Sequence, residues 1–82
     1  MVKRDAGQAE ADPLAHLDAL HRVALRLARR PGDAEDLVQE TYLRAIRGAD
    51  RFEPGTNLRA WLFRVMRNVF LDGRRRESRS PI

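Results

Sequence analysis

Arginine, asparagine and tryptophan recur in the segment NLRAWLFRVMRNVFLDGRRRE, which runs from Asn57 to Glu77. Arginine neutralises phosphate, an asparagine amide hydrogen-bonds a base edge, and an aromatic ring stacks on an unpaired base. At helical spacing, Trp61, Arg64 and Asn68 share one half-exposed edge. Arg67 lies further round the helix, and three more arginines close the segment: Arg74, Arg75 and Arg76. With few acids on it, this face is a candidate for binding nucleic acid. The alternative is that Trp61 is a core residue with one exposed edge and the arginines only confer solubility.

A second candidate surface is acidic. Asp33, Glu35, Asp36 and Glu40 place four acids within eight residues without a basic residue among them. Acids in the first turn of a helix complement its dipole, which explains the first three without any function. Glu40 and its neighbour Gln39 lie beyond that turn, so the pattern also fits a surface for a basic partner.

Catalytic and metal-binding patterns are missing from the sequence. It contains no cysteine, and His16 and His21 are five residues apart, so they do not share a helix face as metal ligands usually do. No Gly-rich phosphate loop follows a strand, and no serine or threonine has a nearby base. The sequence therefore predicts neither an enzyme nor a cofactor or metal site.

The charge of the chain is unevenly distributed. Residues 1–53 carry nine Lys/Arg and ten Asp/Glu, whereas residues 54–82 carry seven Arg and two acids. A basic end of this kind favours a polyanionic partner. The N-terminal residues lack the apolar stretch of a signal peptide, and no run approaches the roughly 18 apolar residues that span a membrane. We therefore expect a cytoplasmic protein without membrane insertion or disulfides.

The elements that position these residues are three helices. Asp12-Pro13 is typical of a helix start, and we expect that helix to end near Arg30. Asp33 is predicted to cap a second helix, in a capping box with Asp36, that ends at Gly48. Thr56 or Asn57 should cap a third from about Leu58 to about Arg76, weakened near Gly73. The predicted fold is a small all-α bundle of three main helices covering residues 13–77. Residues 1–12 should form a flexible tail, and residues 78–82 a frayed end or the start of a linker.

Apolar residues at helical spacing predict which side chains form the core. The first two helices should bury the following residues: Leu14, Leu17, Leu20, Ala24, Leu27, Ala34, Leu37, Val38, Thr41, Tyr42, Ala45 and Ile46. The third should bury Leu58, Leu62, Val65 and Val69, with Met66 beside them.

Two segments together resemble a known family. DAEDLVQETYLRAIRGADRF (33–52) and PGTNLRAWLFRVMRNVFLDGRRR (54–76) are similar to region 2 of bacterial sigma factors, in particular the extracytoplasmic-function group. The resemblance covers about residues 13–77 and depends on two motifs, D-x-x-Q-E and N-L-R-A-W-L-F-R. It implies a helical domain that binds core RNA polymerase and the promoter −10 element, and an anti-sigma factor as a further partner.

The resemblance also implies roles for single residues. Asp36, Gln39 and Glu40 match positions that contact the coiled coil of the polymerase beta-prime clamp, and we expect them on one face. The third helix and the loop before it match the part that holds the non-template strand of the −10 element and reads a flipped base. The corresponding residues are Asn57, Leu58, Trp61, Arg64, Arg67 and Asn68. Arg74, Arg75 and Arg76 would extend this positive surface.

One departure from the family concerns length. Sigma factors normally carry a second helical domain that reads the −35 element, and Ile82 lies about where the linker to that domain would begin. We therefore expect either one domain of a longer protein or a short form. Two alternatives remain: a stand-alone helix-turn-helix regulator that prefers duplex DNA, and a truncated sigma homologue that sequesters an anti-sigma factor.

Overall fold

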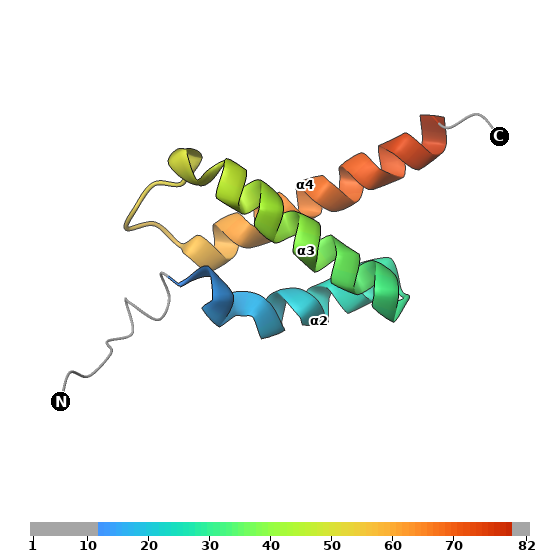
Figure 1. The fold of residues 1–82 in the computed structure, drawn as a ribbon, viewed down its shortest axis with the longest axis horizontal. Coiled ribbons are helices and arrows are strands. Elements are labelled where there is room, and N and C mark those ends of the chain that lie inside the picture. Colours follow the sequence, from blue (N-terminus) through green and yellow to red (C-terminus); the bar gives the residue numbers. More distant parts are fainter. Residues whose placement is uncertain (1–11, 80–82) are drawn as a thin grey trace.

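The computed structural model describes residues 12–79, with side chains as far as Arg76, and it confirms the all-α fold of three main helices (Figure 1). Residues 1–11 of the tail predicted over residues 1–12, and the last three residues of the chain, lie outside the described part. In chain order the elements are η1 (Pro13–His16), α2 (Leu17–Ala28), α3 (Pro31–Arg47), η2 (Ala49–Arg51) and α4 (Leu58–Arg79). Helix α3 packs against both α2 and α4 and is the centre of the bundle.

The first predicted helix is divided into a 3₁₀ turn and a shorter α-helix. Asp12 caps the start as expected, because its Oδ1 accepts a hydrogen bond of 3.0 Å from the backbone N–H of Leu14. The turn η1 precedes α2, which ends at Ala28, two residues before the expected end. Arg29 has a φ of 69°, a left-handed conformation that cannot continue a helix. The hydroxyl of Tyr42 donates to the carbonyl of Pro13 at 2.7 Å and ties η1 to α3.

The predicted start of the second helix was wrong. Helix α3 begins at Pro31, and Arg30 occupies the cap position without a side-chain hydrogen bond. Proline suits the first helical position because its φ is already helical and its missing N–H would have no partner there. Asp33 therefore lies within the first turn, and the expected capping box with Asp36 does not form.

Helix α4 begins where the sequence indicated and extends further than expected. The backbone N–H of Ala60 donates to Oδ1 of Asn57 at 3.0 Å, so Asn57 is the capping residue. Thr56 instead closes the preceding turn, with its hydroxyl donating to the carbonyl of Glu53 at 2.6 Å. Gly55 in that turn has a φ of 89°, which favours glycine. The helix runs through Gly73 to Arg79, past the predicted end near Arg76.

The core is narrower than the apolar stripes predicted. It contains Leu20, Ala24, Ala34, Leu37, Val38, Thr41, Ala45, Leu58, Leu62, Met66 and Val69. Leu14 and Ile46 were expected to be buried but are 67% and 71% exposed, and Leu17 is also exposed. In α4, Val65 was predicted to lie in the core with Met66 beside it. The structure shows the reverse, with Met66 buried and Val65 half-buried. An apolar stripe read from spacing is wider than the surface that two neighbouring helices can cover.

Candidate nucleic-acid interface

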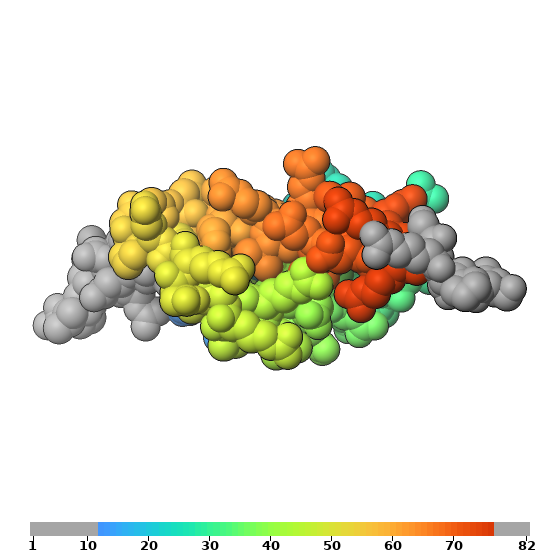
Figure 2. All heavy atoms as spheres, turned by 90° about the horizontal axis from the view of Figure 1, so that it is seen from above, coloured from blue at the N-terminus to red at the C-terminus, as the bar shows by residue number. Residues whose placement is uncertain are grey.

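A shallow groove with four arginines lies between the C-terminal end of α3 and the middle of α4. We call it the arginine groove, and it is lined by Arg44, Arg47, Gly48, Arg51, Trp61, Arg64, Val65 and Asn68. Figure 2 shows this side of the molecule, with α4 in orange and red beside the end of α3 in yellow-green. The structure thus brings together the three residues predicted to share an edge, Trp61, Arg64 and Asn68. None of the described residues that line the groove is acidic.

The other arginines of the groove come from a segment that sequence analysis did not assign to DNA. Arg44 and Arg47 are in the last turns of α3, and Arg51 ends η2. Their spacing of three and four residues could have indicated a shared basic surface from the sequence, since residues at this spacing lie on one helix face. Two chain segments therefore supply positive charge to one depression.

Part of the Trp61 side chain packs inside the domain, and part of it is exposed. Its ring packs on Phe52, with centroids 5.3 Å apart and planes inclined by 48°, a tilted aromatic pair. Phe52 directly follows η2, so this contact holds the connector against α4. Trp61 is nevertheless only half-buried and is part of the groove lining. The alternative that Trp61 is a core residue with one exposed edge agrees with this packing. Part of the indole surface is exposed in the groove.

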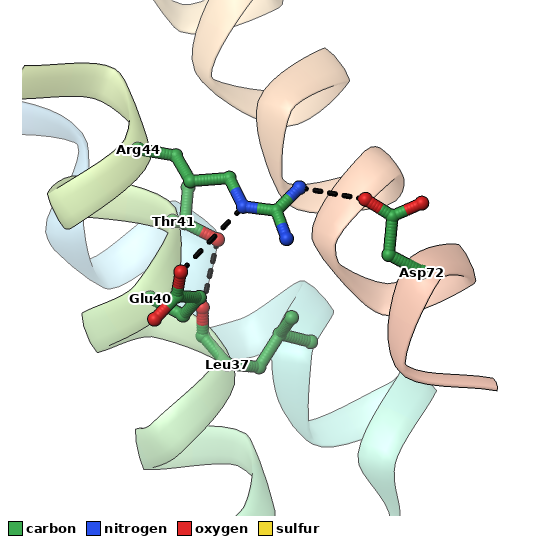
Figure 3. Close-up of polar contacts among 5 residues, drawn as sticks. All are labelled: Leu37, Glu40, Thr41, Arg44 and Asp72. Carbon is green, nitrogen blue, oxygen red and sulfur yellow. Dashed lines mark hydrogen bonds and ion pairs between the residues drawn. The ribbon is translucent and has the colours of Figure 1, made fainter. Parts of the chain in front are cut away.

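Arg44, which lines the arginine groove, also takes part in a network of ion pairs (Figure 3). Arg44 donates from Nη1 to Oδ2 of Asp72 on α4 at 2.8 Å, and its Nε is 3.5 Å from Oε2 of Glu40. Arg75 lies 3.7 Å from the other carboxylate oxygen of Asp72. The hydrogen bond from Arg44 holds the pKa of Asp72 below its ordinary value. Asp72 is therefore ionised at neutral pH and links α3 to α4.

Comparison with known proteins identifies the family. The sigma-70 region 2 family matches residues 14–80. The chain belongs to this family. Over 68 residues it is 46% identical to the ECF RNA polymerase sigma factor EcfG of Rhodopseudomonas palustris, an alignment that covers 83% of this chain and 38% of that protein. It is also 45% identical over 64 residues to the ECF RNA polymerase sigma factor SigE of Mycolicibacterium smegmatis, covering 78% of this chain and 24% of that protein. The region 2 domain described here thus spans well under half the length of these relatives.

The remaining residues predicted to bind DNA are spread over the region 2 domain. The amide oxygen of Asn57 is engaged in capping α4, and Leu58 is buried in the core. Arg67 is exposed but does not line the arginine groove. The guanidinium of Arg74 lies 5.6 Å from the ring centroid of Phe70, a cation–π contact. Arg74 and Arg76 line a different hollow.

The candidate acidic surface of α3 contributes residues to two different depressions, of which this hollow is one. The hollow lies between the end of α2, the start of α3 and the end of α4, and its charged residues are Arg26, Arg29, Asp33, Asp36, Glu40, Arg74 and Arg76. Gln39 instead lines a depression with Leu17 and His21 of α2. Asp36, Gln39 and Glu40 were expected on one face of α3. At about 100° per residue they span an arc of about 100°, with Asp36 between the other two.

The region 2 domain shows no sign of a metal centre or a membrane span in its described part. Residues 12–79 contain no group of three His, Cys, Asp or Glu side chains that could hold a metal ion. None of the helices in this range is long and apolar enough to cross a membrane.

Proposed function

We propose that this region 2 domain binds the −10 promoter element as single-stranded DNA and docks on core RNA polymerase during transcription initiation. The observation that supports this most is the arginine groove. It places four arginines from two chain segments beside a half-exposed tryptophan and an exposed asparagine. Protein grooves that hold single strands combine positive charge along the backbone with aromatic rings on which bases stack.

The composition of the groove favours a single strand over a duplex. A stacking ring such as Trp61 gains energy only from an unpaired base, because the bases of a duplex already stack on one another. Asn68 is exposed in the same groove, about two helical turns along α4 from Trp61, where its amide can hydrogen-bond the edge of a displaced base. The arginines contact phosphates and contribute affinity without sequence preference.

Asn68→Ala should reduce discrimination at one base position. A specific base-edge contact is worth about 1–3 kcal/mol, and the arginines that supply general affinity remain in this variant. The measurement is fluorescence anisotropy with a panel of single-stranded −10 oligonucleotides in which each base is changed in turn. An equal loss of affinity for all sequences would show that Asn68 does not read a base.

We further propose that the acidic side of α3 docks on the beta-prime clamp of the polymerase. Asp36 and Gln39 are exposed on the first half of α3, and Glu40 is half-exposed. They lie within an arc of about 100° around that helix, so one partner surface can contact all three. An anti-sigma factor is a further proposed partner that would compete for such a surface.

Gln39→Ala should weaken binding to core polymerase without loss of folding stability, because Gln39 is exposed. Truncating an interface residue that matters costs more than about 1 kcal/mol, which corresponds to about fivefold or more in affinity. Asp36→Ala should behave alike. Asp50→Ala is its matched control, since Asp50 is an exposed aspartate in η2, beyond the C-terminal end of α3. The measurement is titration of core enzyme with labelled domain. Equal affinities for Gln39→Ala, Asp36→Ala and Asp50→Ala would exclude this docking surface.

A further inference from the structure

Asp72 places a carboxylate against the arginine groove. It reaches from α4 to Arg44, a residue of the groove lining, at 2.8 Å (Figure 3). It also lies 3.7 Å from Arg75. One acid therefore holds two arginines, one on each helix. Among the residues that the structure describes, no acid lines the groove. Asp72 is an acid that pairs with one of the groove arginines, and the proposed DNA contacts do not require it.

A carboxylate and a phosphate bind a guanidinium through the same geometry, with anionic oxygens accepting from its N–H groups. The two side chains of the Arg44–Asp72 pair keep 30% and 40% of their surface exposed. An ion pair with that much exposure is screened by water and weak, so a stronger anion can replace one partner. A DNA phosphate entering the groove would meet Arg44 already occupied by Asp72.

We propose that Asp72 is an internal competitor of the DNA backbone that limits the affinity of the arginine groove for a single strand. In the free domain it occupies Arg44 and Arg75, and a bound strand displaces it from these arginines. This inference rests on the proposed binding of single-stranded DNA. The opposite role would be to position Arg44 for the phosphate, and the two roles predict opposite signs when Asp72 is removed.

The test is Asp72→Asn in the full 82-residue chain, measured by fluorescence anisotropy with a single-stranded −10 oligonucleotide at several salt concentrations. Asparagine keeps the size of the side chain and removes its charge. We expect affinity to rise about two- to fivefold at low salt, the size of a half-exposed ion pair. Because the bound strand contacts Arg44 and Arg75 in both proteins, the dependence of log affinity on log salt should stay nearly the same.

Two controls separate competition from a general change of charge. Asp50→Asn alters net charge equally at an exposed position outside the groove lining and should give a smaller gain. In an Arg44→Gln, Arg75→Gln background, Asp72→Asn should give no gain beyond that of Asp50→Asn. Weaker or unchanged binding by Asp72→Asn, or an equal gain from Asp50→Asn, would overturn the inference.

The failure of this inference can be distinguished from failure of the proposed function. If the wild-type domain binds single-stranded DNA through the groove and Asp72→Asn binds no tighter, only the competitor role is wrong. If the wild type does not bind single-stranded DNA, or if truncating Trp61 and Arg64 leaves binding unchanged, both are wrong.

Discussion

Leu62→Ala is expected to lower the free energy of unfolding by about 2–5 kcal/mol. Leu62 has no exposed surface and lies in the middle of the core, beside the equally buried Met66. The loss combines the transfer energy of the removed methyl groups with the cavity left behind. A domain of this size has a total stability of only about 4–12 kcal/mol, so this loss removes a large part of it.

Urea unfolding followed by circular dichroism measures this loss, and Leu71→Ala provides the matched control. Leu71 is on the same helix but 36% exposed, so its truncation should cost well under 1 kcal/mol. For a domain this small, each kcal/mol corresponds to about 4–8 °C in melting temperature. Equal stability of the two variants would mean that α4 does not bury the side that contains Leu62.

Trp61→Ala should weaken binding to single-stranded DNA about 5- to 150-fold. Stacking of one base on an aromatic side chain is worth about 1–3 kcal/mol by alanine substitution, and a factor of ten corresponds to 1.4 kcal/mol. Trp61 is the aromatic residue that lines the arginine groove. Because its loss removes an aromatic ring rather than a charge, the salt dependence of binding should stay the same.

Trp61 also packs on Phe52, so the effect on binding must be separated from an effect on folding. Trp61→Phe keeps a ring for both contacts and should retain most of the affinity, whereas Phe52→Ala removes the packing partner but leaves the indole. The fold of each variant is checked by circular dichroism before binding is measured. If Trp61→Ala is folded and binds as tightly as wild type, no base stacks on this residue.

The sequence predicted the helices well because their ends carry local signals. Asp12 and Asn57 cap helical segments through their own side chains, and Gly48 follows the last residue of α3. The start of α3 was misjudged because two local signals competed. Pro31 fixes the backbone directly, whereas Asp33 offers only a side-chain hydrogen bond, and the proline determined the boundary.

The candidate site was predicted only in part, because spacing along one helix does not reveal what a neighbouring segment adds. Trp61, Arg64 and Asn68 were placed correctly on one edge of α4. Arg47 and Arg51 join them only because α3 packs against α4 and η2 follows the end of α3, a tertiary arrangement. Ile46 was mispredicted for the same reason. Its helical spacing fits a core position, but none of the described segments covers it, and its side chain is exposed.

Binding of the wild-type domain to one −10 sequence, offered as a single strand and as a duplex, tests most directly whether the arginine groove captures unpaired DNA. Fluorescence anisotropy at two or more salt concentrations should show tighter binding to the single strand. Arg47→Ala combined with Arg64→Ala removes one arginine from each helix and should lower the salt slope for the single strand by about 1.4. Arg22→Ala, on the exposed side of α2, should leave binding nearly unchanged. Equal or tighter binding of the duplex, or a double variant that binds like wild type, would contradict single-strand capture in this groove.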